Sequence, residues 1–236
     1  MLKSLFMQKF VFLLFFGILV KGSAICAQPM DSVAAKATAL RDEFVAKIRG
    51  MGFSVSLPAP KIVFDNPRSY GNYSADSNVL HIADWNTLDA ESKGRFNAAA
   101  GSQGSGMTGE QYFELSVHQW IFIHELGHWW RACQHQTAKP YENEMAANRI
   151  AIAFWREKDP AFMAFKLAGY QRTLKMFPNP VPSGVSKVDY LNNNYDKLPG
   201  GQAYIWYQAS MIVDGCAESP TRSFRQAVES SGSGGN

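Results

Sequence analysis

The sequence has few cysteines, no long apolar run and almost no excess of charge of one sign. Its three cysteines among 236 residues form no Cys-x-x-Cys pair, so metal ligation by cysteine is not expected. The apolar run over residues 10–20 is shorter than the roughly 20 residues that cross a bilayer. The formal net charge is only +3, which argues against a nucleic-acid partner or an anionic-membrane surface.

The first 27 residues are typical of a secretory signal peptide. Basic residues precede the apolar run, and small residues follow it at Gly22, Ser23, Ala24 and Ala27. We expect cleavage after Ala27 and a secreted or periplasmic protein, with cleavage after Cys26 or an uncleaved anchor as alternatives. The segment holds three lysines and no acidic residue, so the mature chain has equal numbers of basic and acidic residues, 20 of each.

Two cysteines remain after that cleavage, Cys133 and Cys216. An even pair in an exported protein permits a disulfide. We expect this bridge in preference to two buried thiols, because it would tie the predicted motif helix to the C-terminal region.

The remaining chain, residues 28–236, predicts one domain of the α+β class, because a few strands come first and helices follow. The expected helices cover residues 31–49, 87–100, 109–131, 141–157, 160–176, 201–214 and 219–229, and the expected strands cover 53–57, 61–64 and 78–82. Thr87 is the expected N-cap of the second helix. Residues 72–78, 101–106 and 178–199 are expected to be irregular, and 231–236 to be a disordered tail.

The segment His124-Glu125-Leu126-Gly127-His128 carries the strongest functional signal. Two histidines four positions apart on a helix lie on one face, one turn apart, and can bind one Zn²⁺. Glu125 points about 100° around the helix, beside the metal rather than at it. Its carboxylate can there take a proton from a water that the zinc activates.

The surroundings of this motif favour a metal site over a chance match on a solvated helix. Residues 120–123 and 129–130 are apolar or aromatic, and three ionisable side chains inside such a helix would be costly to bury without partners. Gly127 costs roughly 1 kcal/mol in the middle of a helix. We therefore expect another backbone to pack closely against it.

A catalytic zinc requires a third protein ligand and an open position. The extended metzincin pattern would need glycine at 131 and histidine at 134, where this chain has Arg131 and Gln134. A glutamate on the following helix fits instead. Glu144 has Asn148 one turn later, which could accept a hydrogen bond from a ligating histidine; Glu142 is the competing ligand.

The His-Glu-x-x-His motif followed by Glu144-x-x-x-Asn148 resembles the gluzincins, the thermolysin-like zinc metallopeptidases. The resemblance covers roughly residues 115–157. It implies a small exported member of bacterial type, with His124, His128 and Glu144 as zinc ligands and Glu125 as general base. It also implies a zincin-like fold, with a small N-terminal sheet, an active-site helix and a helical C-terminal half. Asn148 departs from the family pattern, which usually has aspartate there.

The resemblance further implies a zinc-dependent endopeptidase that acts on a peptide or protein substrate, and a His or Tyr that stabilises the oxyanion. No histidine follows Glu144, so the candidates are Tyr190, Tyr195, Tyr204 and Tyr207, or His81 from an expected cleft-edge strand. The alternative function is a zinc-binding interaction module that turns over no substrate. The sequence does not indicate an oligomeric state.

Overall fold

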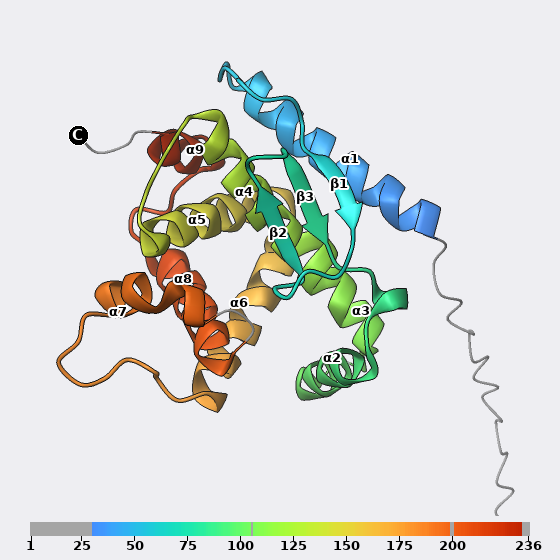
Figure 1. The fold of residues 1–236 in the computed structure, drawn as a ribbon, viewed down its shortest axis with the longest axis vertical. Helices are drawn as coiled ribbons and strands as arrows, with labels where there is room; N and C mark the ends of the chain where they lie inside the picture. The colour runs from blue at the N-terminus through green and yellow to red at the C-terminus, as the bar shows by residue number, and fades with distance from the viewer. Residues whose placement is uncertain (1–29, 105, 199–200, 233–236) are drawn as a thin grey trace, which may run out of the picture.

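The computed structural model describes residues 30–104, 106–198 and 201–232, so the expected signal peptide lies outside the described residues. It is an α+β fold that is mostly helical, with one small sheet (Figure 1). Its elements are α1 (Met30–Gly50), β1 (Lys61–Phe64), β2 (Gly71–Ser74), β3 (Val79–Ile82), η1 (Trp85–Thr87), α2 (Ala90–Ser102), α3 (Gly109–Phe113), η2 (Glu114–Ile121), α4 (Phe122–Cys133), α5 (Pro140–Lys158), α6 (Pro160–Met176), α7 (Lys187–Asn194), η3 (Tyr195–Lys197), α8 (Gln202–Ala217) and α9 (Phe224–Gly232).

The sheet has the order β1-β3-β2, with β1 parallel to β3 and β2 antiparallel to it. Two strand predictions, 61–64 and 78–82, are confirmed to within a residue. The turn-rich segment at residues 72–78 was expected to be irregular, but its first three residues belong to β2. β3 is the central strand, so the expected place of His81 on a cleft-edge strand is wrong.

The expected strand at residues 53–57 is absent, although its side chains alternate. The segment runs instead along the end of α4, which supplies its polar partners. Ser56 Oγ donates a hydrogen bond to the carbonyl oxygen of Cys133. Gln134 Nε2 donates one to the carbonyl oxygen of Ser54 at 3.2 Å. Phe53 packs edge-on against Trp130 at 5.7 Å between ring centroids. Polar groups of the segment 53–57 thus bond to residues at the end of α4 rather than to a neighbouring strand.

The bounds of α1 were predicted closely, whereas the start of α2 was not. α1 begins and ends within a residue of the expected bounds. α2 begins later than expected, because Asp89 rather than Thr87 is its N-cap and accepts a hydrogen bond from the Ser92 backbone. Residues 85–87 form the short η1 helix before it. α2 also extends to Ser102, into the expected loop.

The motif lies on a long helix that runs from Gly109 to Cys133 without a break, behind the sheet in Figure 1. Its start is fixed by a capping box, in which Thr108 and Gln111 bond each other's backbone. The middle part, η2, is a π-helix with hydrogen bonds from residue i to i+5. Local π-helical segments are frequent at functional sites, and this one ends just before the motif.

The C-terminal half is helical, as expected, and α5, α6 and α8 match their expected ranges to within about three residues. The segment 178–199 was expected to be irregular, but it contains α7 and η3. Ser231, expected in a disordered tail, belongs to α9 and is buried. Its carbonyl oxygen accepts a hydrogen bond from Arg131 at 3.1 Å. Residues 233–236 lie outside the described residues.

The core consists of two groups of buried side chains. The larger lies between α1, the sheet, α4, α5 and α9, and its largest members include Phe44, Phe122, Trp129, Trp130, Phe154 and Phe224. The smaller lies between α5, α7 and α8 around Met145, Leu191, Tyr207 and Met211. None of the helices in the described part of the chain combines the length and apolar character needed to cross a bilayer.

The expected disulfide does not form: Cys133 and Cys216 are both free thiols. Cys133 ends α4 beneath the segment 54–58, and burial raises the pKa of its thiol. Cys216 lies near the end of α8, where its carbonyl oxygen accepts a hydrogen bond from Arg156 at 2.7 Å. The two cysteines therefore lie in different local environments, one at the end of α4 and the other near the end of α8.

Gly127 packs against the backbone of α5, as the sequence predicted. A Cβ atom added there would lie 3.0 Å from the Cα and 3.2 Å from the Cβ of Ala147. Gly127→Ala gains roughly 1 kcal/mol of helix propensity, but overpacking costs about 1–3 kcal/mol and a backbone cannot move aside cheaply. We expect a net loss of up to about 2 kcal/mol in the free energy of unfolding, measured by urea denaturation.

Gly94 provides the matched control for this change, because it lies in α2 and an added Cβ would meet nothing within 4 Å. Gly94→Ala should stabilise the protein by about 0.5–1 kcal/mol. Equal effects of the two substitutions would contradict the packing role of Gly127.

Candidate metal centre

The two motif histidines converge at the middle of α4. Nε2 of His128 lies 3.1 Å from Nε2 of His124, and both side chains are largely buried. The ligand atoms of His124, Glu125 and His128 all lie within 4.8 Å of one another. This buried His-Glu-His group could bind a metal ion.

Glu144 reaches the same point from α5. Its Oε2 lies 3.2 Å from Nε2 of His124, and its Oε1 lies 3.6 Å from Nε2 of His128. α5 can approach this closely because Gly127 faces Ala147 across the helix contact. The competing residue, Glu142, is exposed in the first turn of α5, whereas the side chain of Glu144 is 4% exposed.

Asn148 lies one turn beyond Glu144 and is fully buried. Its Oδ1 is 3.0 Å from Nδ1 of His124, the ring nitrogen that faces away from Glu144. When His124 carries its proton on Nδ1, Asn148 accepts the hydrogen bond and leaves Nε2 available as a ligand. The structure thus places Asn148 where the sequence predicted it.

Glu125 is held by the edge strand rather than by the histidines. Its Oε2 accepts a hydrogen bond of 2.8 Å from the backbone N–H of Tyr73 in β2. Gly71 makes this approach possible, since a Cβ there would lie 2.3 Å from Ile121 Cγ2 and 3.3 Å from Glu125 Cγ. The two acidic residues therefore have different environments: Glu144 faces both imidazoles, and Glu125 is bonded to the sheet.

Residues from α8 and η3 complete the site, and one of them was missed by sequence reasoning. Gln208 donates from Nε2 to Glu144 Oε2 at 2.7 Å and to Tyr204 Oη at 3.0 Å, and its Oε1 accepts from Asn148 Nδ2 at 3.1 Å. Tyr195 Oη donates to Glu144 Oε1 at 2.5 Å. The available signal for Gln208 was an amide in the middle of the largely apolar sequence of α8.

Charges within this buried cluster shift several pKa values. Burial acts to raise the pKa of Glu144, but the hydrogen bond from His124 and the charges of both histidines outweigh it and lower that pKa far below its usual range. Burial acts to lower the pKa of His124, yet Glu144 raises it overall. The pKa of His128 is lowered by burial. Glu144 is consequently a carboxylate at neutral pH, as a metal ligand must be.

The structure separates the four tyrosine candidates. Tyr195 and Tyr204 contact the Glu144–Gln208 pair. Tyr207 donates instead to the backbone of Lys187 and stacks on Tyr190 in the smaller core group. His81 lies 2.5 Å from a carboxylate oxygen of Asp65, on the central strand. Only the first two tyrosines are therefore next to the candidate ligands.

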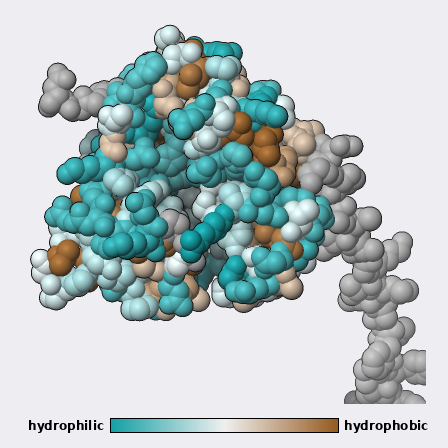
Figure 2. All heavy atoms as spheres, viewed as in Figure 1, coloured by the Kyte–Doolittle hydropathy of each residue, from teal (hydrophilic) through white to brown (hydrophobic). Residues whose placement is uncertain are grey.

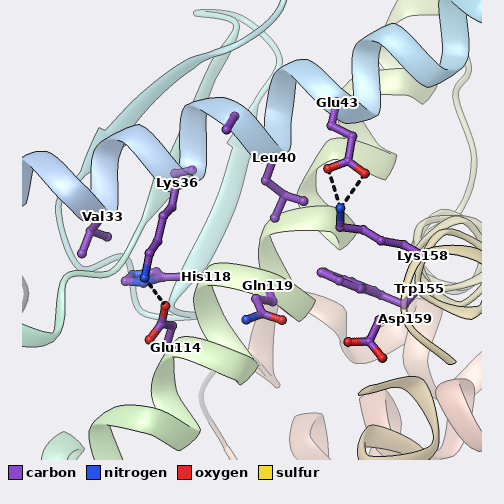
Figure 3. A pocket seen from close by; sticks show the side chains of 12 residues that line it. Val33, Lys36, Leu40, Glu43, Glu114, His118, Gln119, Trp155, Lys158 and Asp159 are labelled. Atoms are coloured by element: carbon purple, nitrogen blue, oxygen red, sulfur yellow. Dashed lines mark hydrogen bonds and ion pairs between the residues drawn. The ribbon is translucent and has the colours of Figure 1, made fainter. Parts of the chain in front are cut away.

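The molecular surface is hollowed near the middle of the face in Figure 2, over the gap between β2 and α8. A separate cavity of about 470 Å³ lies between α1, η2 and the end of α5 (Figure 3). None of the motif residues lines it. Its lysines are paired with carboxylates, Lys36 with Glu114 at 3.1 Å and Lys158 with Glu43 at 2.6 Å. The candidate metal centre is therefore separate from this cavity.

Comparisons with protein-family models, with curated protein sequences and with solved structures find no match for this chain. The function is therefore inferred from the residues of the candidate metal centre themselves.

The hydrogen bond from Asn148 to His124 provides a test of the centre. Asn148→Ala removes the acceptor that orients the imidazole, and loss of such a partner typically weakens metal affinity about 10- to 100-fold. We expect this weakening in a competition titration against a chelating indicator. Asn143, which bonds Arg131 from the same helix, provides the control: Asn143→Ala should leave metal affinity unchanged. Wild-type affinity in Asn148→Ala would contradict the assignment.

Proposed function

We propose that this protein is a zinc-dependent peptidase in which His124, His128 and Glu144 hold the metal and Glu125 is the general base. One observation carries the proposal: two imidazole nitrogens and the carboxylate of Glu144 meet from two helices, with the nitrogens 3.1 Å apart and a carboxylate oxygen 3.2 Å from one and 3.6 Å from the other. Tetrahedral zinc with bonds of about 2.1 Å separates its ligand atoms by about 3.4 Å. The residues present therefore fit zinc, and we infer a zincin-like arrangement of helix and sheet.

Zinc held by these residues would polarise a substrate carbonyl and lower the pKa of a bound water to about 7. Glu125 would carry out the proton transfer. The Tyr73 N–H holds its Oε2, so Oε1 would accept the proton of the attacking water and then deliver it to the leaving amine. An amide bond would thereby be hydrolysed with no covalent intermediate on the protein.

Tyr195 is the candidate that would stabilise the oxyanion. Burial, and after it the charge of Glu144, raises the pKa of Tyr195, so its hydroxyl keeps its proton at neutral pH. That one proton is donated to Glu144 in this structure, and it would turn to the substrate for this role. Removal of a single oxyanion donor costs on the order of 10²-fold in kcat. We expect Tyr195→Phe to lower kcat by about that factor, with KM and zinc content unchanged.

Tyr190→Phe is the control for that substitution, because Tyr190 packs on Tyr207 away from the ligands. A loss of zinc in Tyr195→Phe would contradict a role with the oxyanion. It would show instead that the hydroxyl positions Glu144.

The proposal is tested by digesting a peptide library with the purified protein and identifying the products by mass spectrometry. Cleavage that is abolished by a chelator and restored by added zinc is the expected result. Stoichiometric zinc without any cleavage would overturn the peptidase assignment in favour of a metal-binding interaction module. We also propose export, which predicts a mature N-terminus at Gln28 when the full chain is expressed in a bacterium.

A further inference from the structure

Lys166 is a buried cation with no acidic partner. It lies on α6, is 4% exposed, and donates from Nζ to Ser116 Oγ at 3.0 Å. The rings of Tyr112 and Tyr170 lie 5.4 and 5.1 Å from Nζ. Among the residues that the structure describes, no carboxylate is within ion-pair distance of this ammonium group. Burial of an unpaired charge is costly.

A second cation without an acidic partner lies further along the same helix, but it is only half-buried. Arg172, further along α6, donates from its guanidinium to Gln103 Oε1. Its Nε is buried and has no hydrogen-bond partner among the described residues. As with Lys166, no ion pair forms to it within the described part of the chain. The lysines around the cavity in Figure 3 differ, since each is matched by a glutamate.

A small cavity of about 10 Å³ lies among these side chains, lined by Gln103, Tyr112, Phe165, Lys166, Gly169 and Tyr170. This space is room for about one water molecule or monatomic ion. Lysine carries only donors, and the tyrosine hydroxyls can donate as well. The lining therefore holds one cation, Lys166, beside two hydroxyl donors, and the space is too small for a phosphate or a peptide carboxylate.

We propose that this cavity binds one small monovalent anion of the size of chloride, held by Lys166 with Arg172 beside it. The anion supplies the counter-charge that the fold omits. The site is distinct from the metal centre, and the inference does not rest on the peptidase proposal.

Thermal unfolding at pH 6 in sodium chloride, against sodium gluconate of equal ionic strength, tests the proposal. A halide that binds only the folded state raises Tm with the logarithm of its concentration above Kd, by about 5–10 °C at 100 times Kd. Lys166→Met should lose the chloride-specific shift. The control Lys158→Met removes an exposed lysine that is already paired, and should keep it. An equal effect of chloride and gluconate on the wild-type protein would overturn the proposal.

A crystal of the wild-type protein grown in sodium bromide provides a measurement that needs no variant. An anomalous peak beside Lys166 Nζ is the expected result, and its absence at saturating bromide would count against the site even if Lys166→Met failed to fold.

The affinity of the site should also depend on pH. Burial lowers the pKa of Lys166 to about 7, and the anion requires its charged form. The neighbouring groups keep their charge state above pH 7, because burial raises the pKa values of Tyr112, Tyr170 and Cys216 and arginine stays protonated. Chloride titrations at pH 6 and pH 8 should therefore differ, with weaker binding by up to about 10-fold at pH 8.

Discussion

Glu125→Gln should abolish most peptide hydrolysis and leave the zinc in place. Glutamine keeps the size of the side chain and can still accept the Tyr73 N–H, but it cannot take a proton from water. General bases contribute typically 10²- to 10⁴-fold to the rate, and we expect a loss of kcat in that range. Steady-state assays with a cleaved peptide, together with zinc analysis of the same sample, measure both quantities.

Glu110 provides a control for this substitution on the same long helix. It lies in the first turn of α3, fourteen positions before His124 in the sequence, so Glu110→Gln should cleave peptides at the wild-type rate. Wild-type hydrolysis by Glu125→Gln would show that another group accepts the proton. Loss of zinc would show instead that Glu125 is itself a ligand.

Glu144→Ala should lose the metal. The substitution removes the carboxylate that lies 3.2 and 3.6 Å from the two imidazole nitrogens, and it deprives both Tyr195 and Gln208 of their acceptor. Loss of a partner that merely orients a ligand costs about 10- to 100-fold in affinity, so loss of the ligand itself should exceed 100-fold. Zinc content after gel filtration and competition titration provide the measurement.

Glu142→Ala decides between the two glutamates that the sequence offered. Glu142 is exposed two residues before Glu144, so its substitution should leave zinc content and activity unchanged. The reverse result, in which Glu142→Ala loses zinc and Glu144→Ala keeps it, would reassign the third ligand.

Sequence reasoning was most accurate where a pattern is local. The helical periodicities of α1, α5 and α6 gave bounds close to those observed, and the spacing of His124, Glu125 and His128 depends only on helix geometry. The placement of Asn148 also followed from a one-turn interval on a helix. Each of these inferences uses neighbours within about four residues, which the sequence displays directly.

It failed where the partner is distant in the chain. The strand at 71–74 contains glycine and asparagine and forms because β3 and Glu125 supply hydrogen-bond partners. The segment 53–57 alternates as a strand does, but α4 takes its polar groups. Gln208 lies 64 positions from Glu144, and no local pattern connects them. The π-helical geometry of η2 has no sequence signal that we can identify.

The hydrogen bond between β2 and Glu125 has an entropic consequence. A glutamate side chain loses about 1.5–2 kcal/mol of rotamer freedom when it is fixed in one conformation. Here the backbone N–H of Tyr73 fixes it when the chain folds, before any substrate arrives. In the proposed reaction, binding energy gained from a substrate would therefore not be used to order Glu125, and more of that energy would remain to lower the activation barrier.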